Sequence, residues 1–145
     1  MTERIITLLR KDTRKISCFF EGSILQNLTN KQITEMIEEI KSIGSIRSAK
    51  IFFDVKLQSE QHKKFIQLGL RPIIVPSDVD VYMALDILDT LHFGEKDIIA
   101  VAIRDTQLLP VVIAARERME VMVITDNNDV AESFSNYSDY LLKLY

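Results

Sequence analysis

The sequence predicts a single α/β domain with a mostly parallel sheet of five to six strands and helices on both faces. Short apolar runs rich in Ile, Val and Phe recur along the chain, and segments with helical periodicity separate them. Strands that alternate with helices in this way pair in parallel through βαβ crossovers. A length of 145 residues is the usual size of one domain, so one core is sufficient.

Six apolar runs are predicted as strands because they are short and enriched in β-branched and aromatic residues. They cover residues 16–20, 46–53, 72–75, 97–102, 121–124 and 140–144. No linker, repeat or low-complexity segment interrupts their order. We therefore expect one domain over residues 16–145, preceded by a basic extension over residues 1–15.

The first two predicted helices have clear end signals. Thr29 and Gln32 have the spacing of a capping box, apolar residues follow at helical intervals, and Gly44 supplies a stop. Residues 58–68 form a second segment with one apolar side. Gly69 follows that segment, at the position where a helix end favours a left-handed residue.

Three more helices are expected in the second half of the chain. The third covers about residues 78–91, and its apolar stripe consists of Met83, Ala84, Ile87, Leu88 and Leu91. The fourth begins near Thr106 and tolerates Pro110 in its first turn, where a missing N–H costs little. A short fifth helix begins near Asn128.

Composition and charge limit the class of protein. A hydrophobic fraction of 47% and a charged fraction of 27% exclude a disordered or fibrous chain. Cys18 is the sole cysteine, so we expect a buried reduced thiol and a cytoplasmic protein. The apolar runs are far shorter than the ~18 residues of a membrane span, so no membrane contact is predicted.

The net charge of −3 does not favour nucleic acid over the whole surface, so a polyanion would have to bind a local basic patch. The N-terminal stretch offers one, in which five cations could follow phosphates: Arg4, Arg10, Lys11, Arg14 and Lys15. A solvated tail without a partner is the alternative interpretation of this stretch.

Carboxylates follow three of the predicted strands. Glu21 follows the first strand, Asp105 the fourth and Asp126 the fifth. Because the carboxyl ends of parallel strands meet at one edge of the sheet, where ligands bind, we expect these acids to converge there. Asp80 joins them, because it lies in the first turn of the third helix, on the side that packs against the sheet. The other acids of that helix, Asp78, Asp86 and Asp89, are expected to be solvated surface charges.

Clustered carboxylates repel one another unless they are protonated or bridged by a cation. Oxygen ligands without His or Cys suit Mg²⁺ or Mn²⁺, and such ions serve in phosphodiester hydrolysis. For Asp80 alone the simpler interpretation is structural, since a helix N-terminus favours negative charge. The cluster as a whole indicates a metal site.

Three motifs resemble those of a known family. The end of the first strand reads Phe19-Phe20-Glu21-Gly22-Ser23-Ile24, where the family has Asp-Gly-Pro-Asn. The third helix opens with Ser77-Asp78-Val79-Asp80-Val81, similar to Gly-Asp-Val-Asp-Val. The fourth strand is followed by Arg104-Asp105-Thr106-Gln107-Leu108-Leu109-Pro110, similar to Arg-Asp-Ala-Asp-Phe-Leu-Pro. Together with Ser138-Asp139-Tyr140 near the C-terminus, these segments resemble the archaeal branch of the NYN domain family, which belongs to the PIN-like nucleases.

The resemblance implies a three-layer PIN-like fold and a site in which Glu21, Asp80 and Asp105 bind Mg²⁺ or Mn²⁺ and cleave RNA. From its place beside Asp105, Arg104 is a candidate phosphate contact, and the basic Arg10, Lys11 and Arg14 are further candidates for contacts with RNA. We interpret Asp139 as structural rather than catalytic. Arg104 can equally form an ion pair with a neighbouring acid, and Asp126 can be part of an ordinary turn.

Three positions depart from the family pattern: Glu21 replaces Asp, Ile24 replaces Asn and Gln107 replaces Asp. A displacement of ~1 Å can cost a catalytic group ~100-fold in rate, so these departures predict a partly degraded, RNA-associated endoribonuclease site. The triple variant that restores all three residues is expected to raise cleavage. An active Mg²⁺- or Mn²⁺-dependent endoribonuclease and a non-catalytic module that binds a protein partner or a second copy are the alternatives.

Overall fold

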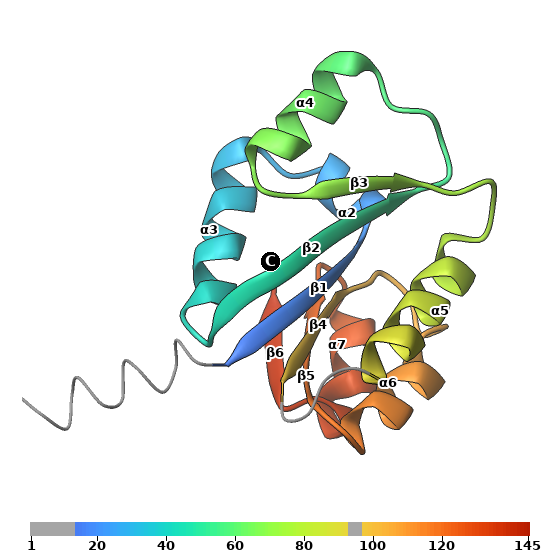
Figure 1. The fold of residues 1–145 in the computed structure, drawn as a ribbon. Helices are drawn as coiled ribbons and strands as arrows, with labels where there is room; N and C mark the ends of the chain where they lie inside the picture. Colours follow the sequence, from blue (N-terminus) through green and yellow to red (C-terminus); the bar gives the residue numbers. More distant parts are fainter. Residues whose placement is uncertain (1–13, 93–96) are drawn as a thin grey trace, which may run out of the picture.

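The computed structural model describes residues 14–92 and 97–145. Within these residues six strands form one sheet in the order β3-β2-β1-β4-β5-β6, and every neighbouring pair is parallel (Figure 1). The strands are β1 Lys15–Glu21, β2 Ser45–Phe53, β3 Arg71–Ile74, β4 Ile98–Ala102, β5 Glu120–Thr125 and β6 Tyr140–Lys143. All six predicted strands are confirmed, each to within one residue at either end.

Helices cover both faces of the sheet, so the fold has the three layers that were predicted. One face carries α2 Gly22–Gln26, α3 Asn30–Lys41 and α4 Ser59–Gln67; the other carries α5 Val79–Leu91, α6 Leu109–Arg116 and α7 Asn128–Phe134, which continues into η1 Ser135–Tyr137 (Figure 1). Alternate residues of the buried strand β4 serve the two cores. Ile98 and Ala100 face the α3 side, whereas Ile99 and Val101 face the α5 side.

The expected helix ends are present where local chemistry defines them. The Thr29 hydroxyl accepts from the N–H of Gln32, and the Gln32 side chain accepts from the N–H of Thr29, which completes the capping box. Gly69 follows α4 with a φ of +84°, which glycine adopts without a Cβ penalty. Pro110 lies in the first turn of α6, as predicted, but that helix begins at Leu109 rather than near Thr106.

The short helix α2 was not predicted, because only five residues form it and its start depends on contacts with another strand. Gly22 opens α2 directly against β2. A Cβ at this position would lie 2.4 Å from the Phe53 ring and 2.6 Å from the Phe52 carbonyl oxygen. Because Gly22 has no Cβ, the start of α2 can lie directly against β2. The position of Gly22 in the sequence does not reveal this contact.

Two expectations for α5 were wrong. Leu88, assigned to the buried stripe, is 40% exposed, because Met83, Ile87 and Leu91 are the residues that face the sheet. Asp86 is not a solvated charge. Its carboxylate accepts from Lys50 Nζ at 2.8 and 3.1 Å, because this side of α5 borders the sheet at β2.

The N-terminal boundary of the domain is described only in part. Arg4, Arg10 and Lys11 lie outside the described residues, so the basic extension over residues 1–15 stays a prediction there. Lys15 already belongs to β1. Cys18 is buried as expected, and burial raises the pKa of its thiol to about 12. None of the helices within the described residues has the length and apolar character needed to cross a bilayer.

Candidate metal centre

The strand order places a crevice at the carboxyl edge of the sheet. The order reverses between β1 and β4, and in open α/β sheets ligands bind at such a switch point, outside the carboxyl ends of the strands. Glu21 is the last residue of β1, and Asp105 lies in the loop after β4. Both acids therefore flank the point where the connection changes direction.

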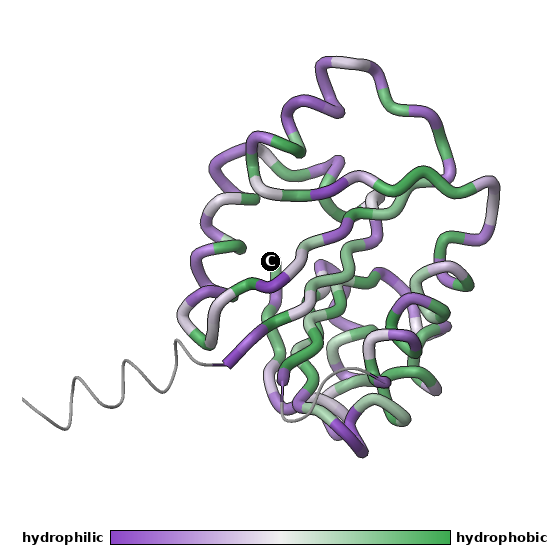
Figure 2. The backbone as a smooth tube through the Cα atoms, in the orientation of Figure 1, coloured by the Kyte–Doolittle hydropathy of each residue, from purple (hydrophilic) through white to green (hydrophobic). Residues whose placement is uncertain are grey.

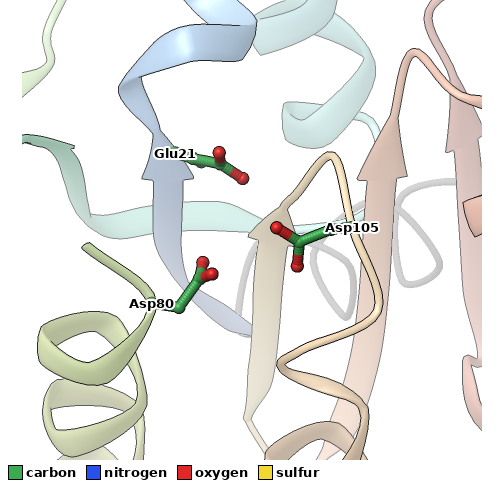
Figure 3. Close-up of side chains that lie close together, drawn as sticks. All are labelled: Glu21, Asp80 and Asp105. Carbon is green, nitrogen blue, oxygen red and sulfur yellow. The ribbon is translucent and has the colours of Figure 1, made fainter. Parts of the chain in front are cut away.

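The third acid reaches the same place from the helix layer. Asp80 lies in the first turn of α5 and projects toward Glu21 and Asp105, so that the three carboxyl groups point into one shared space (Figure 3). One carboxylate oxygen from each residue lies within 4.8 Å of the others. The structure thus brings together the three acids that the sequence predicted as one site.

Local hydrogen bonds orient two of these carboxylates. Glu21 Oε1 accepts from Ser23 Oγ at 2.8 Å, and Glu21 Oε2 accepts from the backbone N–H of Arg104 at 3.1 Å. Asp105 Oδ1 accepts from the backbone N–H of Gln107 at 2.9 Å. A carboxylate offers about four lone-pair positions, so each group keeps acceptor capacity for a cation.

Asp80 is held differently, because its Oδ1 atom is buried without a hydrogen-bond partner in the described part of the chain. The pKa of Asp80 is raised to about 6. Desolvation by burial is the largest cause, and repulsion from Asp105 and from Glu21 adds to it. A buried carboxylate oxygen without a partner is costly in free energy. A cation among the three acids would remove that cost, and three carboxylates are the ligands that Mg²⁺ and Mn²⁺ prefer. The donor set therefore fits a divalent cation.

The backbone that delivers Asp80 is unusual at its start. Asp78 precedes the helix with a φ of 48°, in the left-handed region that Asp adopts more readily than most residues. Its side chain makes no capping hydrogen bond to α5. This left-handed residue connects the segment after β3 to the first turn of α5, in which Asp80 faces the strand ends.

Arg104 and Asp126 follow the neighbouring strands β4 and β5. Arg104 is exposed, and its Nε lies 3.5 Å from Asp126 Oδ1, which is ion-pair distance without hydrogen-bond geometry. Asp126 is not among the three clustered acids. Asn127 caps α7 by accepting from the N–H groups of Asp129 and Val130. These contacts favour the interpretation of Asp126 as part of an ordinary turn before a capped helix, rather than as a member of the acid cluster.

Arg14 lies far from the acids. It precedes β1, whereas Glu21 ends the same strand, and its guanidinium donates to Glu120 and to Tyr140 Oη. Its suggested role as an RNA contact remains a prediction. Asp139 accepts from the N–H of Val121 at 2.8 Å, in keeping with a structural role.

Two residues missed by sequence reasoning border the site. A pocket of about 260 Å³ lies beside the cluster, and its lining includes Glu21, Asp80, Ser23 and Asp54. Asp54 directly follows β2, so its place after a strand is the signal that could have found it. The Ser23 hydroxyl donates a hydrogen bond to the Glu21 carboxylate two residues earlier. The two groups meet because α2 begins at Gly22, which the sequence did not predict.

Two of the three departures from the family pattern now have a structural context. Ile24 is fully buried in the core on the α3 side, whereas Gln107 is exposed. An Asn at position 24 would bury an amide among apolar side chains, which is unfavourable unless the amide finds hydrogen-bond partners.

Comparison with known proteins agrees with the motifs and the fold. The uncharacterised protein MJ0482 of Methanocaldococcus jannaschii is 27% identical over 137 residues, which cover 93% of this chain and 57% of that protein's length. The crystal structure of VPA0982 from Vibrio parahaemolyticus, a protein of unknown function, superposes with a TM-score of 0.73 at 14% identity, over 91% of this chain and 93% of that one. The NYN domain family matches residues 15–144. The chain therefore belongs to the NYN domain family, a branch of the PIN-like nuclease superfamily, as the resemblance of its motifs implied.

Proposed function

We propose that this chain binds a single Mg²⁺ or Mn²⁺ ion through Glu21, Asp80 and Asp105 and cleaves RNA slowly at this site. One observation carries the proposal: three carboxylates from distant segments have oxygens within 4.8 Å of one another, and one of them has a buried oxygen without a partner. Repulsion among such groups is relieved by a bridging cation. A divalent ion bound there would activate water and neutralise charge that develops on a phosphate.

The chain's own groups support a phosphodiester substrate. The pocket of about 260 Å³ opens beside the acids and is lined by Ser23 and Gln26 as well as by apolar Val55 and Val79. The Arg104 side chain is exposed and is free to exchange its long contact with Asp126 for a phosphate oxygen. Membership in the NYN domain family supports RNA as the phosphodiester in this proposal.

The slow rate follows from how the acids are held. Both oxygens of Glu21 already accept hydrogen bonds, and the longer side chain places its carboxylate about one methylene away from an Asp at this position. Gln107 carries no charge, so this position cannot help to hold a second ion as the carboxylate of the family pattern would. Ile24 has an apolar side chain that is buried in the core, so position 24 contributes no polar group to the site.

Ile24 also provides the observation that favours a second candidate, an RNA-binding module without catalysis. In helix α2 a buried core residue, Ile24, stands where the family pattern has a polar residue, so the site lacks that polar group. Such a protein would bind RNA and metal without cutting. Cleavage with a defined metal response separates the two candidates.

The test is cleavage of a mixed single-stranded RNA by the full chain during a Mn²⁺ titration. We expect weak cleavage that requires Mn²⁺, stops in EDTA and is lost in Asp80→Asn. The double variant Glu21→Asp/Gln107→Asp should cleave ~100-fold faster, because it corrects one position and adds one charge. Ile24→Asn is left out of this restoration, since its burial would confound the result. Asp89→Asn, on the exposed side of the same helix, is the matched control.

The titration of the double variant decides between the candidates. Cleavage that rises with Mn²⁺ and disappears when Asp80→Asn is added supports the nuclease. If the folded double variant binds Mn²⁺ and RNA but leaves the RNA intact, the binding module is the better description. Cleavage that persists in Asp80→Asn would exclude this cluster as its source.

A further inference from the structure

The helices of this fold differ in what they present to solvent. Every exposed residue of α3 and α7 is polar or charged, and α4 exposes a single apolar side chain, Ile66. In contrast, four of the five exposed residues of α5 are apolar, as are three of the four of α6. Figure 2 shows that most residues of α5 and α6 are hydrophobic, whereas most residues of the outer helix α4 are hydrophilic. An exposed helix side that is mostly apolar is a candidate contact surface.

The exposed apolar residues of α5 form a continuous stripe. Val81, Leu85 and Leu88 follow the i, i+4, i+7 spacing of one helix side, and Val81 and Leu85 are 55% and 59% exposed. Tyr82 flanks this stripe. On the neighbouring helix α6, which packs beside α5, Pro110 and Ala114 are exposed as well. We call these six residues the α5–α6 patch.

We infer that the α5–α6 patch is the contact surface for a second copy of this chain, which pairs with α5 antiparallel across a two-fold axis. With Val81, Tyr82, Leu85 and Leu88 exposed by 55%, 38%, 59% and 40%, the patch presents apolar surface on the order of a few hundred Å². A standard dimer buries about 800 Å² per partner, of which roughly 60% is apolar. The patch is therefore of the same order as the apolar share of one side of a standard dimer.

Polar groups at the ends of the stripe favour a self-complementary partner. Exposed Asp78 lies before the first turn of α5, and exposed His92 follows its last residue. A two-fold axis near Leu85 brings Val81 of one copy opposite Leu88 of the other, and Asp78 opposite His92. Each interface then contains the same acid–imidazole pair twice, as an isologous contact requires.

RNA does not fit this surface. The segment of α5 contains no Lys or Arg, and Arg116 at the end of α6 is the one cation of that helix. Nucleic-acid binding depends on such cations. Asp80 also lies on the opposite side of α5 from Leu85, toward the strand ends, so pairing through the α5–α6 patch leaves the acid cluster accessible.

The oligomeric state in solution tests this inference directly. An interface of standard size binds in the micromolar range or tighter, so at about 100 µM we expect light scattering to give twice the mass of one 16.7 kDa chain. Leu85→Glu should weaken the dimer at least ~30-fold, because it buries a charge at the centre of the contact. Ile66→Glu, a similarly exposed apolar residue on α4, should leave the dimer unchanged. A monomeric wild type, or a dimer that survives Leu85→Glu, would overturn the inference.

A cross-link tests the geometry without a destabilising charge. Cys18 is the sole cysteine and is buried, so Leu85→Cys introduces a single accessible thiol. Near a two-fold axis two such thiols can approach the ~3.8 Å between Cβ atoms that a disulfide needs. Mild oxidation should give a covalent dimer much faster in Leu85→Cys than in Ile66→Cys. Equal rates in the two variants would show that the copies do not meet at α5.

Discussion

Asp80 is the residue at which metal binding and the stability of the fold are most directly coupled. In the absence of metal its carboxylate is partly desolvated, lies beside Asp105 and Glu21, and has one buried oxygen without a partner. Replacing it with Asn keeps the shape of the side chain and removes the charge. We therefore expect Asp80→Asn to stabilise the metal-free protein at neutral pH while it removes metal binding. Proteins commonly gain stability when a functional group of this kind is lost.

The magnitude follows from the pKa. The ordinary value for an aspartic acid here is 3.8, and in the folded protein the pKa of Asp80 rises to about 6. The folded state thus binds more protons than the unfolded state between about pH 4 and pH 6, so the unfolding free energy falls as pH rises through this interval and stays low above it. A fully buried group would give ~3 kcal/mol, and we reduce this to about 1 kcal/mol because Asp80 is partly exposed and solvent screens its charge.

Thermal unfolding followed by circular dichroism in EDTA measures this effect. The stability difference between Asp80→Asn and wild type should grow from near zero at pH 4 to about 1 kcal/mol at pH 7.5, or roughly 3 °C in Tm. Asp89→Asn should differ from wild type by less than ~0.5 kcal/mol at both pH values. With Mn²⁺ at 100 times its Kd the wild type should gain about 2.7 kcal/mol, and the order of the two proteins should reverse.

Two outcomes would refute this reasoning. If Asp80→Asn is less stable than wild type at pH 7.5 in EDTA, the carboxylate is stabilised in the folded state rather than strained. If the difference between the two proteins does not change between pH 4 and pH 7.5, the stability effect does not come from the titration of Asp80.

Three further predictions concern the residues that build the site. Asp105→Asn should weaken Mn²⁺ binding at least ~10-fold by calorimetric titration, since it removes one of three charged ligands, and unchanged binding would count against the cluster. Gly22→Ala should lower the unfolding free energy in urea by about 1–3 kcal/mol, because its Cβ would meet the Phe53 ring, whereas a neutral result would show that α2 can shift. Ile24→Asn should cost about 3 kcal/mol by the same measurement and Ile24→Val only about 1, because the amide would be buried without a partner; equal losses would mean that position 24 is accessible to water.

Much of the architecture was determined by the sequence alone. The strands were predictable because most are short apolar runs rich in Ile, Val and Phe, and β1, β4 and β5 are buried along nearly their whole length. Helix α3 was predictable because Thr29 and Gln32 cap it through contacts three residues apart. The positions of Glu21 and Asp105 followed from the same logic, since an acid at the end of a parallel strand must lie at the carboxyl edge of the sheet. These features depend on local chemistry or on the period of the pattern.

The tertiary structure alone decided how the acids and their neighbours are held. Glu21 is oriented by the N–H of Arg104, which is 83 residues away in the chain. Asp86 of α5 forms an ion pair with Lys50 of β2. Leu88 is exposed because the rotation of α5 is set by the packing of Met83 and Ile87 against the strands. The sequence could place such residues on a helix or at a strand end, but the contacts between segments distant in sequence determine which charges are paired and which apolar side chains remain at the surface.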